Sequence, residues 1–200
     1  FYSGNNCEKI YSNRSESTRQ GINMFAEKYK LLFHREIKTK NSQFSILNSQ
    51  LKIGLPRALG IYENYPFWHA LFSYCGIKVV LSQPSTNTLY QRGIHTVMAD
   101  NICFPAKLMH GHIYNLISRG VDRIFYPYVV YEQKEDSHSA NSFNCPVVSG
   151  YSDVIRSAID PADRHNITLD SPTISFNNPQ LLQKSCCEYL TSLGIDKTTA

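Results

Sequence analysis

The sequence lacks a long apolar run. No stretch of its 200 residues approaches the roughly 20 apolar residues that a membrane-spanning helix needs. The first residues also do not follow the charged, apolar and small-residue order of a signal peptide. The basic residues behind the formal net charge of +4 are scattered, apart from a modest concentration between Lys28 and Lys52. We therefore expect a cytoplasmic protein whose partners are neither a membrane nor nucleic acid.

Signatures of nucleotide hydrolysis and of acyl transfer are missing too. The sequence has no glycine-rich phosphate loop, no nucleophile elbow and no Ser-His-Asp order. The chain begins at Phe1 without an initiator methionine, and Asp196 or Thr198 is suited to cap a further helix beyond Ala200. We expect a fragment of a larger multidomain protein, truncated at its C-terminal end, in which ATP hydrolysis belongs to other domains.

The cysteines do not form a CxxC pair, which argues against a zinc knuckle or ribbon. Any metal site would have to be assembled from distant loops. Three disulfides would suit a secreted protein, but a chain with 42% hydrophobic residues and no export signal does not need them, so we expect reduced thiols. The six cysteines are Cys7, Cys75, Cys103, Cys145, Cys186 and Cys187.

Two regions differ in their patterning. Residues 1–50 are polar, with one amphipathic stretch from Ile22 to Ile37, and predict an arm, a helix and a linker. Residues 51–200 alternate short apolar runs with helical stretches, which predicts a three-layer α/β domain with a mainly parallel sheet and crossover helices. The predicted strands are Lys52 to Leu55, Lys78 to Leu81, Arg123 to Tyr126, Val147 to Val148 and Ile167 to Ile174. The predicted helices are Tyr62 to Cys75, Thr86 to Gly93, Pro105 to Gly120, Tyr151 to Ala158 and Pro179 to Leu193.

The edge of such a sheet is where a site is expected, because ligands of open α/β sheets gather beyond the carboxyl ends of the strands. Cys103 directly precedes a predicted helix, whose amide ends and dipole favour a thiolate. Its alternative role is that of a small buried hydrophobic residue. Cys145 lies beside Pro146 after a polar loop, and Cys7 lies in the polar arm, where it is either a ligand or a bystander.

Several segments carry a resemblance to a known family. They are Ser3 to Glu8, Ile53 to Leu59, Tyr62 to Trp68, Cys103 to His112, Phe125 to Pro127 and Asn144 to Pro146. On these segments the chain resembles the activator-related domains of 2-hydroxyacyl-CoA (2-hydroxyglutaryl-CoA) dehydratase activators, which are often fused behind ATPase modules. The resemblance covers most of the chain.

The resemblance implies a part in low-potential electron transfer, in which an ATP-driven iron-sulfur reductase passes one electron to a dehydratase-like partner built from related α/β domains. The ATPase domains of the same polypeptide are the other implied partner. Cysteines from separate loops hold a [4Fe-4S] cluster in the related domains, and two of those positions carry over to Cys103 and Cys145. Where a third cysteine is expected, this chain has Tyr128, and a phenol with an unperturbed pKa of about 10 replaces a thiolate poorly.

Two hypotheses follow from Tyr128. In the first, Cys7 or a neighbouring domain supplies the third ligand, and the chain is an electron-transfer accessory domain with no catalysis of its own. In the second, the cluster is lost and the chain is a scaffold or docking module. A dehydratase-like enzyme that acts on an acyl-CoA ranks last, because no acid-base set is evident.

Three charged residues near the strand ends are predicted to contact a cofactor or a partner. Arg57 and Glu63 bracket the loop after the first strand, and Lys107 follows Cys103. The alternatives are a mutual ion pair or a helix cap for the first two, and a solvated charge for Lys107. His110 and His112 stand two apart on a predicted helix and therefore cannot easily bind one metal together. Packing is the expected role of the remaining cysteines, Cys75, Cys186 and Cys187.

Overall fold

A computed structural model describes residues 22–34, 51–136 and 138–196 of the chain. The helices are α2 (Met24–Phe33), α3 (Leu59–Tyr74), α4 (Asn87–Gly93), the 3₁₀ helix η1 (Ile94–Thr96), α5 (Phe104–Ser118), α6 (Pro146–Ala158), α7 (Pro161–His165) and α8 (Pro179–Ser192). The strands are β1 (Lys52–Leu55), β2 (Lys78–Leu81), β3 (Arg123–Phe125), β4 (Tyr128–Tyr131), β5 (Thr168–Asp170) and β6 (Thr173–Ser175). Among the described residues, no helix combines the length and apolarity needed to cross a membrane.

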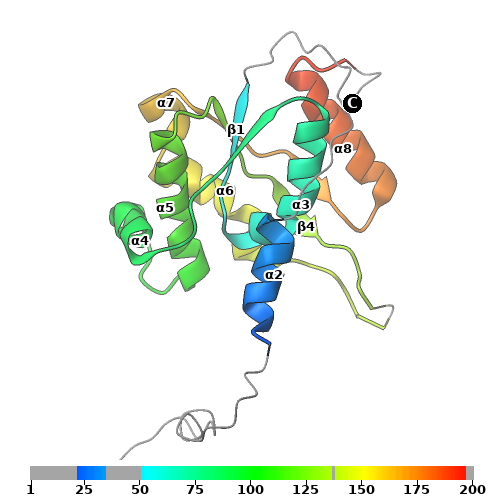
Figure 1. The fold of residues 1–200 in the computed structure, drawn as a ribbon, viewed down its shortest axis with the longest axis horizontal. Coiled ribbons are helices and arrows are strands. Elements are labelled where there is room, and N and C mark those ends of the chain that lie inside the picture. The colour runs from blue at the N-terminus through cyan, green and yellow to red at the C-terminus, as the bar shows by residue number, and fades with distance from the viewer. Residues whose placement is uncertain (1–21, 35–50, 137, 197–200) are drawn as a thin grey trace, which may run out of the picture.

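The central sheet has the strand order β2-β1-β3-β5, and every neighbouring pair is parallel. A separate parallel pair is formed by β4 and β6. Figure 1 shows α4 and α5 on one side of β1, and α3 and α8 on the other. The predicted three-layer α/β fold with a mainly parallel sheet is therefore confirmed.

The core between the sheet and α3 is aromatic. Trp68 and Phe72 of α3 lie with their ring centroids 4.6 Å and 5.1 Å from the ring of Phe125 in β3, and all three side chains are at most 1% exposed. Each fully buried ring of this kind contributes about 1.5–3 kcal/mol to stability relative to an exposed one. This packing fixes α3, and with it the loop that joins β1 to α3, against the carboxyl end of the sheet.

The contact between α4 and α5 depends on two glycines. A Cβ atom on Gly111 of α5 would lie 2.1 Å from the carbonyl oxygen of Leu89 in α4, and one on Gly93 would lie 2.2 Å from the amide nitrogen of Gly111. Such distances are far inside van der Waals contact, so only glycine lets the two helix backbones approach this closely. The same packing holds α5, and therefore its N-cap residue Cys103, in place.

One predicted strand is wrong. Val147 and Val148 lie in the first turn of α6, which begins at Pro146 after the N-cap residue Cys145. Proline at the first helical position is preorganised for a helix, and two apolar residues are too few to distinguish a strand from a helix. Residues 144–148 therefore form a helix start, and the thiol of Cys145 stands at a helix N-terminus.

Other boundaries also differ from the sequence-based prediction. The stretch predicted as one strand from Ile167 to Ile174 is divided at Ser171 and Pro172 into β5 and β6, which belong to different sheets. Strand β4 and the short helix α7 were not predicted. The predicted N-terminal helix is present as α2, whereas the predicted arm, the linker and the helix beyond Asp196 lie outside the described residues.

Candidate functional site

Cys103 and Cys145 occupy equivalent positions, as the N-cap residues of α5 and α6. Both are exposed free thiols, and each is followed by a proline in the first turn of its helix. No side-chain cap bond to the first-turn amides is formed at either end within the described residues. The uncapped amides and the helix dipole give each of these helix ends a partial positive charge, which suits an anionic group.

Helices α5 and α6, whose N-termini carry the two thiols, pack against each other. The hydroxyl of Tyr151 on α6 lies 3.0 Å from Nε2 of His110 on α5. The pKa of Tyr151 is raised, first by burial and then by the charge of Cys103. Cys103 is thus close enough to α6 for its ionisation to influence a tyrosine of that helix.

Tyr126 adds a buried polar group beside these helices. Its side chain is 2% exposed, and its hydroxyl has no hydrogen-bond partner among the described residues. Burial raises the pKa of Tyr126 strongly, and Tyr151 and Cys103 raise it further. The phenol is therefore neutral at any physiological pH and keeps an unused donor near the Cys103 end of α5.

Tyr128 lies in β4 and is tied to α6. Its hydroxyl donates a hydrogen bond of 2.5 Å to Oδ1 of Asp153, which also accepts a bond of 2.5 Å from Arg156. The guanidinium of Arg156 donates further to Oγ of Ser171, at 3.2 Å. The position that the family resemblance assigns to a third cysteine is thus a member of a hydrogen-bonded surface network.

The described residues do not complete a cluster site. They contain no group of three or more His, Cys, Asp or Glu side chains that could hold a metal ion. Cys7, the third predicted ligand, lies outside the described residues. This part of the chain therefore presents two thiols suited to ligation and lacks the remaining ligands of a cubane, so the ligand roles of Cys103, Cys145 and Cys7 stay predictions.

Arg57, which was predicted to contact a cofactor, is covered by α2. Its guanidinium lies 4.7 Å from the ring centroid of Phe33 and 5.6 Å from that of Tyr29, and it donates a hydrogen bond to the Tyr29 hydroxyl. Burial lowers the pKa of Arg57 against the opposing effect of the nearby tyrosines. Tyr29 and Phe33 are four residues apart on α2, and this spacing predicts only a helix face. The sequence therefore gave no sign of their contact with Arg57.

The other two charged candidates have partners of their own. Glu63 of α3 pairs with Lys28 of α2 at 2.7 Å, while Lys107 of α5 donates a bond of 2.7 Å to the carbonyl oxygen of Asp100. Of these three residues, Glu63 lines the cavity described below, and Arg57 and Lys107 do not. Their cofactor-binding role stays a prediction, and α2 already contacts two of the three.

The two histidines of α5 face different partners. His112 is bonded through Nδ1 to Oγ of Ser82 at 2.8 Å and through Nε2 to Oγ of Ser85 at 3.0 Å. His110 reaches Thr96 through Nδ1, at 2.8 Å, as well as the Tyr151 hydroxyl. Both rings are fully buried, and burial lowers the pKa of each to about 4. They are neutral residues of the packed interior at pH 7 and do not converge on one point.

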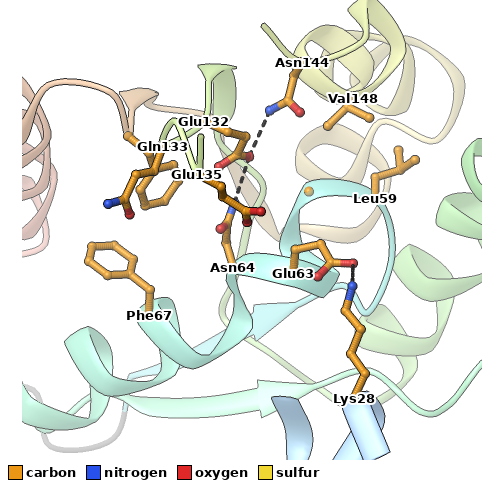
Figure 2. Close-up of a pocket in the computed structure, with 12 residues that line it drawn as sticks. Lys28, Leu59, Glu63, Asn64, Phe67, Glu132, Gln133, Glu135, Asn144 and Val148 are labelled. Atoms are coloured by element: carbon orange, nitrogen blue, oxygen red, sulfur yellow. Dashed lines mark hydrogen bonds and ion pairs between the residues drawn. The ribbon is translucent and has the colours of Figure 1, made fainter. Parts of the chain in front are cut away.

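A cavity of about 640 Å³ opens between α3, the segment after β4 and the start of α6. Figure 2 shows Glu132, Gln133 and Glu135 on one wall, Asn64 and Phe67 of α3 on another, and the ion pair between Lys28 and Glu63 at the rim. Within the sequence, Glu132 and Glu135 belong to a polar loop that carries no motif. Only the fold brings them to the N-terminal half of α3.

These observations define a class: a three-layer α/β domain that presents two exposed thiols at helix N-termini. Comparison with known proteins identifies the family. Residues 52–200 match the family model described as a CoA enzyme activase uncharacterised domain, and the chain belongs to that family. Helix α2 precedes the matched range. Neither the curated proteins nor the solved structures gave a match.

Proposed function

We propose that this chain is the accessory domain of an ATP-driven activator and takes part in low-potential electron transfer, with Cys103 and Cys145 as two of the thiolate ligands of a [4Fe-4S] cluster. Membership of the CoA enzyme activase family supports a role in an activator-related protein. The observation that carries the finer proposal is the paired placement of the two thiols. Both are exposed N-cap residues of two helices that pack against each other, where the helix dipole suits an anionic group.

The remaining ligands have to come from outside the described residues, because these offer no third metal-ligating side chain at the site. Cys7 is one source, and a neighbouring domain of the same polypeptide or a dehydratase-like partner is the other. When bound, a cluster of this type supplies one-electron transfer. The protein's own contribution is to hold two thiols at fixed helix ends and to keep the neutral Tyr126 hydroxyl near one of them.

Anaerobic reconstitution with iron and sulfide tests this proposal on the full 200-residue chain. We expect about four irons per chain for the wild type, with visible absorbance of a cubane cluster. Cys103→Ala and Cys145→Ala should each lose that iron. Cys187→Ala, which removes a thiol on the distant helix α8, serves as the matched control and should keep it. Wild-type protein without iron, or Cys103→Ala protein with the wild-type amount, would overturn the proposal.

A cluster-free docking module is the second candidate, and one observation favours it. The Tyr128 hydroxyl is already bonded to Asp153, so the third ligand position has a structural use. Tyr128→Cys separates the two candidates, because a lost ligand should be restored by the thiol. If the variant binds more iron than the wild type, Tyr128 marks a lost ligand and the cluster-free module is favoured. About four irons per chain in both proteins favours the electron-transfer proposal, and no iron in either protein favours the docking module.

A further inference from the structure

One wall of the cavity beside α3 holds a carboxylate that is oriented without being neutralised. Oε1 of Glu132 accepts a bond of 3.1 Å from the side-chain amide of Asn64 and one of 2.9 Å from that of Asn144. The Asn144 amide is itself fixed by a bond of 3.0 Å to the carbonyl oxygen of Val129. Both donors are neutral and therefore supply no positive charge to the half-buried carboxylate, and its second oxygen accepts no bond within the described part of the chain.

The cavity as a whole carries excess negative charge. Glu63 is compensated by Lys28 at 2.7 Å, but neither Glu132 nor Glu135 has a cationic partner among the described residues. Two uncompensated carboxylates on one wall repel each other and attract a cation. A phosphate-bearing ligand such as a nucleotide or a CoA thioester would meet repulsion here, which separates this cavity from the acyl-CoA hypothesis.

Two aromatic side chains also line the cavity. Phe67 and Phe176 meet edge to face, with ring centroids 5.3 Å apart and an angle of 81° between their planes, and Phe67 remains 37% exposed. Aromatic faces attract planar cations, and a guanidinium both stacks on a ring and donates paired hydrogen bonds to a carboxylate. The wall shared by Glu132 and Glu135 supplies the acceptors for such a group.

We propose that the cavity formed by Glu132, Glu135, Asn64 and Phe67 binds an alkyl guanidinium group. The group is either the side chain of an arginine in a polypeptide segment or a free alkyl guanidine. Its planar head bonds to Oε2 of Glu132, its face packs on Phe67, and its alkyl stem fills the remaining length of the 640 Å³ cavity. The proposal does not depend on a cluster, because none of these residues is a thiol.

Calorimetric titration of the full chain with n-butylguanidine and with n-butylurea tests the proposal, because the two probes have the same shape and differ in charge. We expect saturable binding of the guanidine and binding of the urea that is at least about tenfold weaker. An arginine-containing tripeptide with blocked ends, compared with its citrulline analogue, provides the polypeptide arm. Tighter binding of the peptide than of the free probe assigns the site to a partner segment, and the reverse assigns it to a small molecule.

Variants locate the binding. Glu132→Gln should weaken guanidinium binding by at least about tenfold, and Glu135→Gln, at an exposed position with no side-chain bond to lose, provides the same test without a folding risk. Glu188→Gln on α8, away from the cavity, removes an equal charge and should bind as the wild type does. Equal binding of guanidine and urea, no saturable binding of either guanidinium probe, or unchanged binding in both cavity variants would overturn the proposal. Iron content should be the same in all of these proteins.

Discussion

Acidification from pH 7 to pH 5 should destabilise this domain through His110 and His112. Both rings are fully buried, and each has a pKa of about 4 in the folded state because burial disfavours its charged form. In the unfolded chain a histidine has a pKa of about 6.5. Between these two values the unfolded chain binds two protons that the folded protein does not, so the stability contribution is complete above about pH 6.5 and is lost as the pH falls towards 4.

The size of the effect follows from the two pKa values. A difference of one pKa unit corresponds to about 1.4 kcal/mol, and for each ring the unfolded chain holds the extra proton over most of the interval between pH 6.5 and 5. The loss is therefore about 2 kcal/mol per histidine and about 4 kcal/mol for the pair. Because whole domains are stable by only about 5–15 kcal/mol, such a loss is readily measured.

Urea unfolding at pH 7 and pH 5, followed by circular dichroism, measures this difference. His112→Gln should lower stability at pH 7, because its bonds to Ser82 and Ser85 are disturbed, and should also reduce the loss on acidification by about 2 kcal/mol. His138→Gln, at a ring that is 92% exposed, should keep the wild-type difference. A wild-type loss below about 1 kcal/mol, or a full loss that persists in the His112 variant, would refute this account of the buried rings.

Two further predictions concern packing and a buried ion pair. Gly111→Ala should lower the free energy of unfolding by at least about 2 kcal/mol, measured with urea, because its Cβ would meet the α4 backbone. Gly150→Ala in α6 has nothing within 4 Å of its Cβ and should raise that free energy by about 0.5–1 kcal/mol. Equal effects of the two changes would contradict the close contact between α4 and α5. Asp170→Asn should cost about 3 kcal/mol, because the 8% exposed carboxylate accepts two bonds from Arg123, at 2.7 and 2.6 Å, and one from Tyr189 at 2.8 Å. A decrease in the free energy of unfolding below about 1 kcal/mol in the same assay would contradict this prediction, because exposed ion pairs contribute only that much.

The central fold was predictable because its strands are short apolar runs with helical stretches between them. Ile53 and Leu55 of β1 and Trp68 and Phe72 of α3 carry this pattern directly, and all four are buried in the structure. The prediction failed where a pattern was too short to have a period. Val147 and Val148 look the same in a strand or a helix, and only the preceding Pro146 and the N-cap position of Cys145 favour the helix.

The candidate site was predictable in part. The placement of Cys103 before a helix was read from the sequence, because proline and the onset of helical periodicity mark that boundary. The contact of Arg57 with Tyr29 and Phe33 was not, because it joins segments far apart in the chain and no local pattern specifies which ring meets which charge. The cavity around Glu132 was missed for the same reason: its walls come from segments far apart in the chain, and each residue is ordinary in its own segment.

Tyr128, the first residue of β4, bears on the choice between the cluster-binding and the cluster-free hypotheses. Tyr128 is bonded to Asp153, and this exposed network contributes no more than about 1 kcal/mol, so stability alone gives little reason to keep a tyrosine there. The thiols of Cys103 and Cys145 are exposed, so their packing neither stabilises nor destabilises the fold appreciably. Two exposed thiols at helix N-termini therefore have no structural reason that the described residues reveal. The ligand role that we propose for Cys103 and Cys145 would give their placement a physical cause.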